Sequence, residues 1–369
     1  MQLAHPPFRA DVVGSLLRPS PVKDARQQQQ AGNLDGDRLR SVENEAIRHA
    51  VACQCQAGLQ VVTDGEFRRA WWHFDFFEGL QGVEGYDADQ GIQFNGVQTR
   101  SRNVRVTGKL GFGQHPMLEH FRFLQSVTNG VTAKMTIPSP SVLHFRGGRN
   151  VVSVEAYPNL DDFFDDLARV YKEALQAFYD AGCRYLQLDD TVWAYLCSEE
   201  QTAKIVERGE DPQQLQRTYA RVINKALEGK PDDLVVSMHV CRGNFRSTWI
   251  SEGGYEPVAE VLFGSVNVDA FFLEYDTDRA GGFEPLRFIR PGHQKVVLGL
   301  VTSKTGELES AEDVKARIHE AAQFVDLDQL CLSTQCGFAS TEEGNTLSEA
   351  QQQAKLELVV QIAKDVWGE

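Results

Sequence analysis

Short apolar runs alternate with longer amphipathic stretches along almost the whole chain. The strand-like runs cover residues 8–16, 59–66, 132–140, 185–190, 234–241, 268–275, 295–303 and 329–336. Helical patterns cover residues 38–56, 160–181, 199–228 and 347–366. Eight short runs rich in Val, Ile and Leu, mostly separated by helices, are typical of a parallel sheet buried on both faces. The pattern therefore predicts an α/β fold, and the count favours a (β/α)8 TIM barrel.

A single domain is expected across residues 1–369, because we find no internal repeat and no linker that would divide the chain. A longer insertion, residues 71–115, separates the second strand from the third, and its residues 104–108 fit a β-ribbon. The alternative architecture is a doubly wound open sheet. No Gly-x-Gly-x-x-Gly motif follows the first strand, which argues against the dinucleotide-binding form of that sheet.

Composition and charge narrow the class of protein. The 369 residues are 42% hydrophobic and 24% charged, as in an ordinary globular protein. The net charge of −15 argues against a nucleic acid or an anionic membrane as partner. The first ten residues lack the apolar core of a signal peptide. The chain contains no apolar run of 18 residues, so we expect no membrane-spanning helix. Seven cysteines without the spacing of a disulfide framework predict a cytoplasmic protein with reduced thiols.

Polar and metal-binding residue types end nearly every predicted strand, although the residues before them are apolar. In a (β/α)8 barrel the chemistry lies at these carboxyl ends. Core packing alone does not explain such a convergence on one mouth of the barrel. The residues are Ser15, Glu66, Asp189 with Asp190, His239 with Cys241, Glu274, Thr302 and Cys336.

Four of these residues predict a zinc site. His239 and Cys241 are two residues apart on one strand, so their side chains point the same way. With Glu274 and Cys336 they offer one imidazole, two thiolates and one carboxylate, a donor set that Zn²⁺ takes readily. Two thiolates and a carboxylate leave the site formally near −1, which is poor for activating water. Such a site suits a substrate thiol that is held as a nucleophilic thiolate, so we expect alkylation of a thiol rather than hydrolysis.

Each assignment has an alternative. The cysteines could be small buried hydrophobic residues, and Glu274 could pair with Arg279. Glu66 could form a local salt bridge or cap a helix. Only one of Asp189 and Asp190 can face the mouth, because side chains alternate along a strand. The aromatic cluster at residues 71–77 could stack a flat ligand, form a hydrophobic lid or contact another subunit.

Together these motifs resemble the catalytic half of the cobalamin-independent methionine synthases. The resemblance runs from residue 13 to residue 337, and its most specific part is the His-x-Cys, Glu, Cys-Gly succession at strand ends. The matching residues are Val13-Gly14-Ser15, Asp64-Gly65-Glu66-Phe67-Arg68-Arg69, Gln187-Leu188-Asp189, His239-Val240-Cys241, Glu274 and Cys336-Gly337.

The resemblance implies a (β/α)8 barrel in which zinc binds the thiol of homocysteine. It assigns the zinc to His239, Cys241, Glu274 and Cys336. It assigns recognition of the homocysteine amino and carboxylate groups to Ser15, Glu66 and Asp189.

Three departures concern the rest of the family's pattern. The full-length enzymes carry a further N-terminal barrel, for which this chain has no room. Thr302 stands where the family has a histidine used in proton transfer, and His144 is the nearest match to a tryptophan that helps to hold the folate. The half of the site that binds the acceptor is kept, whereas the half that binds the methyl donor is altered.

The sequence therefore predicts a zinc enzyme that transfers a methyl group to homocysteine, giving methionine, with methyltetrahydrofolate or another compound as donor. One alternative is alkylation of a different small thiol, as in the epoxyalkane:coenzyme M transferases. Another is a non-catalytic zinc- or thiol-binding protein. The partners expected are small molecules; a homodimer, or a protein that delivers the donor, stays open.

Overall fold

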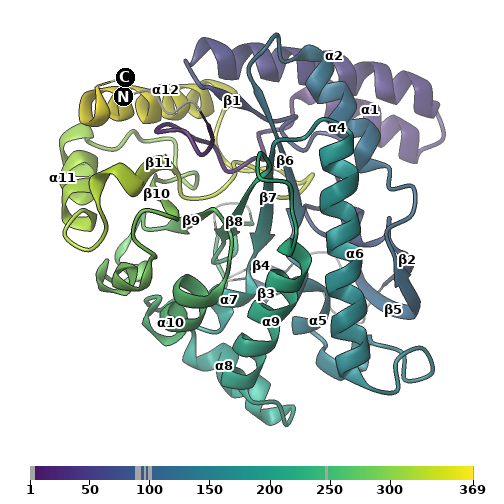
Figure 1. The fold of residues 1–369 in the computed structure, drawn as a ribbon. Coiled ribbons are helices and arrows are strands. Elements are labelled where there is room, and N and C mark those ends of the chain that lie inside the picture. Colours follow the sequence, from purple (N-terminus) through teal and green to yellow (C-terminus); the bar gives the residue numbers. More distant parts are fainter. Residues whose placement is uncertain (1–4, 88–92, 95–96, 99–101, 246–247, 369) are drawn as a thin grey trace.

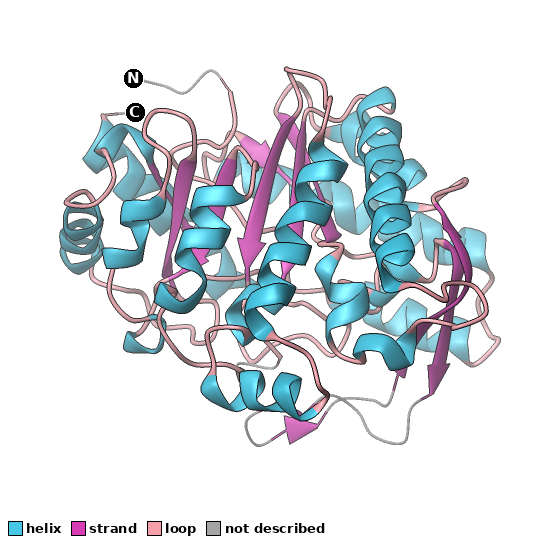
Figure 2. Cartoon of the chain, turned by 60° about the horizontal axis from the view of Figure 1, so that its bottom comes forward, coloured by secondary structure: helices cyan, strands magenta, loops and turns pink. Residues whose placement is uncertain are grey.

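A seven-stranded parallel sheet forms the centre of the computed structural model, which describes residues 5–87, 93–94, 97–98, 102–245 and 248–368. Its strand order is β1-β6-β7-β8-β9-β10-β11, and every neighbouring pair is parallel. The sheet is curled, and helices cover its outer face (Figures 1 and 2). The strands are β1 (Val61–Val62), β2 (Gln81–Asp87), β3 (Gln93–Phe94), β4 (Val97–Gln98), β5 (Arg102–Gly111), β6 (Thr132–Pro138), β7 (Tyr185–Asp190), β8 (Val235–Val240), β9 (Ala270–Glu274), β10 (Lys295–Val301) and β11 (Leu330–Thr334).

The predicted helix at 38–56 is α2, and those at 160–181 and 347–366 are α6 and α12. The helical region predicted over 199–228 forms two helices, α8 and α9. Gly209 has a φ of +80° and ends the first helix, and the Asp211 side chain caps the second at Gln213 N. The helices are α1 (Ser20–Gln30), α2 (Gly36–Gln56), α3 (Phe74–Phe77), α4 (Met117–Val127), α5 (Ser141–Phe145), α6 (Leu160–Asp180), α7 (Val192–Tyr195), α8 (Glu199–Glu207), α9 (Pro212–Leu227), α10 (Glu256–Ser265), α11 (Ala311–Ala321) and α12 (Glu349–Trp367), with short 3-10 turns at Gly148–Val151, Asp278–Ala280, Glu284–Phe288 and Leu327–Gln329.

The first predicted strand, residues 8–16, is not a regular strand. Ala10 forms a single parallel bridge with Leu332 of β11, and Leu16 N donates to the carbonyl of Gly65 beyond β1 at 3.0 Å. Between these points the backbone carbonyls accept hydrogen bonds from side chains. Gln187 Nε2 donates to Val13 O at 2.8 Å, and the Thr63 hydroxyl donates to the carbonyl of Gly14. The segment thus spans the two edges of the sheet without a continuous ladder to either.

Residues between β1 and β6 contribute elements that lie outside the parallel sheet. Strands β2 and β5 form an antiparallel ribbon, which contains residues 104–108, the predicted ribbon. The ribbon stands at one side of the molecule in Figure 2. Among the described residues, no helix is long and apolar enough to cross a membrane.

A buried polar group lies inside the curled sheet, near the amino ends of its strands. We call Asp11, Lys134 and Tyr185 the floor cluster. Lys134 Nζ lies 3.2 Å from Asp11 Oδ1 and donates to Val12 O, and both charged side chains are fully buried. The Tyr185 hydroxyl donates to Asp11 Oδ2 at 3.0 Å. These contacts hold the N-terminal segment against β6 and β7.

Candidate metal and substrate site

A cavity that opens to solvent lies at the carboxyl ends of the strands. Strand alternation explains why polar groups line it: in β7, Gln187 points inward to Val13 O, so Asp189 two residues later points inward as well. The cavity brings together six residues that the sequence nominated. They are Ser15, Glu66, Asp189, His239, Cys241 and Cys336.

The four predicted metal ligands converge at the same end of the sheet. One donor atom from each of His239, Cys241, Glu274 and Cys336 lies within 4.8 Å of the others, and all four side chains are buried. The two sulfur atoms are 3.5 Å apart. Glu274 is the last residue of β9, while Cys241 and Cys336 follow β8 and β11 directly or within two residues. We call these four residues the mouth cluster.

The surroundings of His239 fit a metal ligand. Its Nδ1 lies 3.4 Å from Asp189 Oδ1, which orients the ring, and its Nε2 lies 3.3 Å from the backbone carbonyl of Gln335, the residue before Cys336. Burial opposes a charged imidazole, but the hydrogen bond to Asp189 and the charges of Cys336 and Glu274 outweigh it and raise the pKa of His239 to about 9. The cluster thus favours positive charge at its centre. One nitrogen, two sulfurs and one carboxylate oxygen suit Zn²⁺.

The two thiols of the mouth cluster differ. The hydrogen bond that Cys241 donates lowers the pKa of Cys336 despite burial, and His239 acts in the same direction. Cys336 is therefore the more acidic thiol of the pair. A thiolate is the form in which cysteine binds metal.

Glu274 belongs to this cluster and not to an ion pair with Arg279. Arg279 lies 3.7 Å from Asp276 instead. One oxygen of Glu274, Oε1, accepts from the backbone N–H of Arg242 at 2.9 Å, and Oε2 has no hydrogen-bond partner among the described residues. A fixed carboxylate whose second oxygen makes no hydrogen bond can turn that oxygen to a metal ion.

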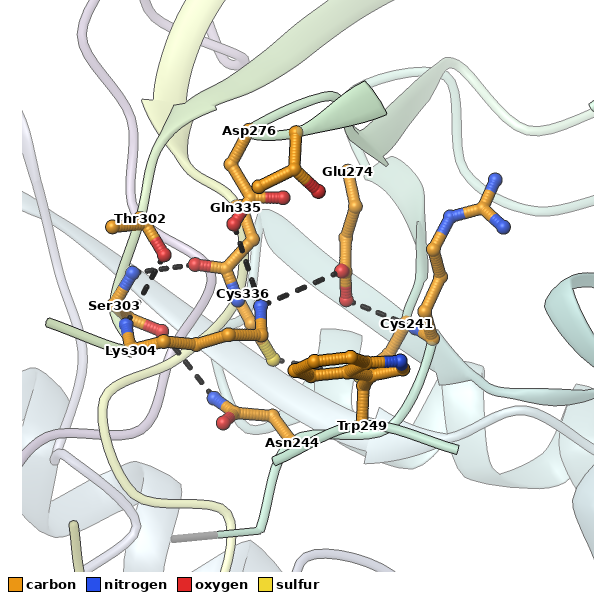
Figure 3. Close-up of polar contacts among 12 residues, drawn as sticks. Cys241, Asn244, Trp249, Glu274, Asp276, Thr302, Ser303, Lys304, Gln335 and Cys336 are labelled. Atoms are coloured by element: carbon orange, nitrogen blue, oxygen red, sulfur yellow. Dashed lines mark hydrogen bonds and ion pairs between the residues drawn. The ribbon is translucent and has the colours of Figure 1, made fainter. Parts of the chain in front are cut away.

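Lys304 is a charged residue of this site that the sequence analysis did not predict. Its Nζ lies 3.9 Å from Glu274 Oε2 and 3.5 Å from Asp276 Oδ2 (Figure 3). Thr302, the strand-end residue that was nominated, does not line the cavity; its hydroxyl accepts from Lys304 N at 3.2 Å. The chain turns after β10, so the third residue past the strand, and not the first, reaches the ligands.

Glu66 is held in a strained turn. Both Gly65 and Glu66 have left-handed φ values, +65° and +61°, and Asp64 Oδ1 accepts from Glu66 N at 2.8 Å. Oε1 of Glu66 accepts from the Thr136 hydroxyl at 2.9 Å, but Oε2 is buried without a hydrogen-bond partner. Burial, opposed by Arg69 and reinforced by Asp189, raises the pKa of Glu66 to about 7. An unpartnered buried carboxylate oxygen in a cavity indicates a ligand with a donor group.

The loop after β11 packs against Ser15. The Ser15 hydroxyl accepts from Ala339 N at 3.3 Å, and its carbonyl accepts from Phe338 N at 2.8 Å. A side chain at Gly337 would place its Cβ 2.0 Å from Ser15 Oγ, so glycine is required after Cys336. Cys336 therefore supplies the sulfur donor, and Gly337 leaves the space that the Ser15 side chain occupies.

The two neighbouring aspartates have different environments. Asp189 lines the cavity and accepts from Gln187 Nε2 at 2.6 Å. Asp190 is fully buried, bonds Ser141, and accepts from the backbone N–H groups of Val192 and Trp193 at the start of α7. Asp189 is thus the one that faces the mouth.

His144 does not line the cavity; its Nδ1 lies 2.9 Å from the Tyr219 hydroxyl, among aromatic rings. The aromatic cluster at 71–77 divides into two parts. Trp71, Trp72 and His73 line the cavity, whereas Phe74, Phe76 and Phe77 are core residues.

The fold and the site define a class: an α/β protein with a thiolate-rich metal donor set at the carboxyl ends of a curled parallel sheet. The chain belongs to the family of the cobalamin-independent methionine synthase catalytic domain, because that family model, "Cobalamin-independent synthase, Catalytic domain", matches residues 8–365.

Relatives and solved structures extend the comparison. The chain is 56% identical to the uncharacterized protein YxjG of Bacillus subtilis, covering 100% of this chain and 97% of that one. A crystal structure of a putative vitamin-B12 independent methionine synthase from Listeria monocytogenes matches with a TM-score of 0.80 and 48% identity over 100% of both chains. A B12-independent methionine synthase from Shewanella sp. W3-18-1 shares the fold, with a TM-score of 0.73, 22% identity and 98% coverage of each chain.

Proposed function

We propose that this protein transfers a methyl group to the thiol of L-homocysteine and forms methionine, with zinc bound by His239, Cys241, Glu274 and Cys336. The observation that carries the proposal is the convergence of these four buried donors within 4.8 Å at the strand ends. Membership of the methionine synthase family supports it. Bound zinc would lower the pKa of the substrate thiol and keep the sulfur as a nucleophilic thiolate.

We assign recognition of the amino acid to Ser15, Glu66 and Asp189. All three line the cavity, and Glu66 Oε2 is a buried acceptor without a hydrogen-bond partner. An ammonium group supplies both the positive charge and the N–H donors that such a pair of carboxylates needs. This favours an amino-acid thiol over a thiol that lacks an amino group.

In the reaction a sulfur–carbon bond forms as the bond between the methyl carbon and the donor atom breaks. The bonding electron pair stays with the donor atom, which takes up the proton that the thiol releases. The protein's contribution is to bind and align the two substrates, so that the sulfur faces the methyl carbon in line. Glu66 and Asp189 fix the amino acid at its other end, which orients the thiol toward the mouth cluster.

The proposed function also has consequences for the topology of the barrel and for the place of the protein in the cell. We infer that residues 10–16 take the eighth strand position of a (β/α)8-type barrel, and that residues 1–369 form one domain. We also infer that the protein works in the cytoplasm, where Cys241 and Cys336 stay reduced. Its partners are then small molecules, homocysteine and a methyl donor.

The experiment is the optical spectrum of the cobalt(II)-substituted protein with and without L-homocysteine. We expect a new sulfur-to-cobalt charge-transfer band, because the substrate thiolate enters the metal shell. A band with coenzyme M but none with homocysteine would overturn the acceptor assignment. A spectrum that no thiol changes would mean that the metal is structural and would overturn the proposed chemistry.

A further inference from the structure

Arg18 is a buried arginine beside the amino-acid pocket, and it has no part in the metal or amino-acid assignments. It is 2% exposed and lies three residues past Ser15. Its guanidinium group donates three hydrogen bonds, and the acceptors are all backbone carbonyls rather than carboxylates. A buried charge without a carboxylate partner costs stability. Such a cost is typical of a position where function requires the charge or its geometry.

The three carbonyls belong to two loops that are far apart in the sequence. Nη2 of Arg18 donates to Glu66 O at 3.0 Å and to Arg69 O at 3.1 Å, in the loop after β1. Nη1 donates to Ala339 O at 2.7 Å, in the loop after β11. The first loop carries Glu66, and the second packs against the Ser15 hydroxyl. One side chain thus joins the two loops that hold the proposed amino-acid ligands.

The turn at Glu66 depends on contacts from outside it. Its φ of +61° is one that residues other than glycine rarely adopt, and such a conformation persists only where the surrounding structure fixes it. The carbonyl of Glu66 accepts from Arg69 N within the turn and from Arg18 Nη2 across it, both at 3.0 Å. Because the N–H groups of a guanidinium lie in one rigid plane, Arg18 fixes the positions of its acceptors relative to one another.

Arg18 also brings positive charge to the carboxylate of Glu66. The charged groups that face this carboxylate are Arg69, at 3.6 Å from Oε1, Asp189 and Arg18. Burial and Asp189 raise the pKa of Glu66, whereas Arg69 and Arg18 lower it. Burial lowers the pKa of Arg18 itself to about 10, so its guanidinium is still charged at neutral pH. Arg18 therefore favours the ionised form of Glu66, which is the form that attracts an ammonium group.

We propose that Arg18 is the positioning residue of the amino-acid pocket, which holds Glu66 toward the cavity in the orientation and charge state that receive the ammonium group of the substrate. The inference rests on the proposed function, since it concerns how the pocket for that amino acid is held. Arg18 does not line the cavity and acts through the loops after β1 and β11. Its loss should weaken the binding of an amino-acid thiol and leave the metal in place.

The test titrates the cobalt(II)-substituted Arg18→Met protein with two thiols and follows the sulfur-to-cobalt band. The thiols are L-homocysteine and 2-mercaptoethanol, which has neither the amino nor the carboxylate group. Affinity for homocysteine should fall about tenfold or more, as expected for the loss of a charge-assisted contact. Affinity for 2-mercaptoethanol and the metal content per folded chain should stay close to the wild-type values. An equal loss for both thiols, or no loss for either, would overturn the inference.

Arg9 offers a matched control, because it is another buried arginine that binds three backbone carbonyls. Its Nη1 donates to Leu327 O, Asp328 O and Leu330 O, at the amino end of β11 and away from the cavity. Arg9→Met should lower the melting temperature, as Arg18→Met does, but should keep the affinity for homocysteine. If both variants lose homocysteine affinity equally, the effect comes from general destabilisation and the inference is wrong.

Arg18→Lys separates the charge from the geometry, since lysine keeps the charge but lacks the planar fork. Its affinity for homocysteine should lie between those of the wild type and Arg18→Met. The pH at which affinity is half lost should stay near the wild-type value in Arg18→Lys. In Arg18→Met it should move upward, because Glu66 has lost a neighbouring positive charge and its pKa rises. Equal pH midpoints in the wild type and Arg18→Met would overturn the role of the charge.

The wild-type titration distinguishes failure of this inference from failure of the proposed function. If the wild-type protein shows no band with homocysteine, the proposed function is wrong and the inference fails with it. If the wild type responds to homocysteine and both Arg18 variants bind it with unchanged affinity, the inference alone is wrong.

Discussion

The floor cluster and the mouth cluster are both buried and charged, yet they differ in how completely the protein satisfies them. At the floor, Asp11 and Lys134 hold each other, and the Tyr185 hydroxyl and the Val12 carbonyl complete their contacts. At the mouth, an oxygen of Glu274 has no hydrogen-bond partner, and the same is true of Glu66 in the adjoining cavity. A buried polar group that is saturated serves the fold, whereas one left unsaturated is available to a ligand.

The same strand contributes to both regions. Tyr185 and Asp189 lie on β7, four residues apart and therefore on the same face. Tyr185 belongs to the hydrogen-bonded floor cluster, whereas Asp189 lines the cavity. The comparison predicts that changes at the floor alter stability and leave metal binding intact, and that changes at the mouth do the reverse.

The largest effect is expected at the floor. Lys134→Met leaves Asp11 buried without its cation and should lower the free energy of unfolding by about 3–5 kcal/mol. The double variant Asp11→Asn with Lys134→Met should recover part of this loss, since no uncompensated charge remains. Urea denaturation measures both, and zinc content per folded chain should equal that of the wild type. Loss of zinc from the folded Lys134→Met protein would break the comparison.

Cys241→Ser should act in the opposite sense. Removal of one thiolate should weaken zinc binding by about a hundredfold or more. This loss of zinc affinity is larger than the loss expected when a residue that merely hydrogen-bonds to a metal ligand is replaced. Activity should fall with it, while the unfolding free energy of the metal-free protein changes little. Cys55→Ser, on α2, is the matched control and should keep its zinc. Normal turnover by a metal-free Cys241→Ser protein would contradict the zinc hypothesis.

The pKa of Glu66, about 7, predicts a pH dependence of substrate affinity. Below that value the carboxyl group is increasingly protonated and no longer attracts an ammonium group. Homocysteine affinity should therefore fall as the pH decreases from 8 to 6, approaching about tenfold per pH unit at the acid end. Titration calorimetry measures it. The Glu66→Gln variant should bind homocysteine weakly across the whole pH range and should lose the part of the pH dependence that Glu66 causes. If the variant keeps the pH profile of the wild type, Glu66 does not belong to the amino-acid subsite.

The smallest effect concerns Lys304. Its ammonium group lies 3.9 Å from Glu274, so its charge should make the metal-bound thiol more acidic. Lys304→Met should raise the pKa of cobalt-bound homocysteine by about one unit, as expected for one partly screened charge at this range. The charge-transfer band, followed against pH, reports it. Lys204→Met, at an exposed position of α8, should leave the titration where it is.

Much of the site could be predicted from sequence because it follows strand ends. His239 and Cys241 needed only the alternation of side chains, and Glu274 needed only its place at the end of an apolar run. The choice between Asp189 and Asp190 needed the strand's orientation in the sheet. The break between α8 and α9 did have a local signal, Gly209 followed by Asp211 and Pro212, which the longer helical pattern obscured.

Other features depend on contacts between distant segments, which no local pattern reveals. Lys304 reaches Glu274 because the loop after β11 fixes the turn after β10: Ser303 Oγ donates to Gly337 O at 3.0 Å. Arg146 enters the cavity because α5 ends beside Tyr195. The first strand was overpredicted because its apolar residues are buried, as in a strand, while side chains take its carbonyls.

The bridge between Ala10 and Leu332 also has a consequence for the order of synthesis. Residues 10–16 find their neighbours among residues 332–339, and the hydrogen bond from Ala339 to Ser15 spans 324 positions. The Arg9 guanidinium accordingly lies over the ring of Trp367 in α12, 5.2 Å from its centroid. Contacts of this sequence separation form slowly and late. On the ribosome, a chain that has not yet reached Cys336 would carry three of the four sulfur, nitrogen and oxygen donors, but not the completed pocket around Ser15. Metal capture by the nascent protein would then wait until Cys336 has been synthesised.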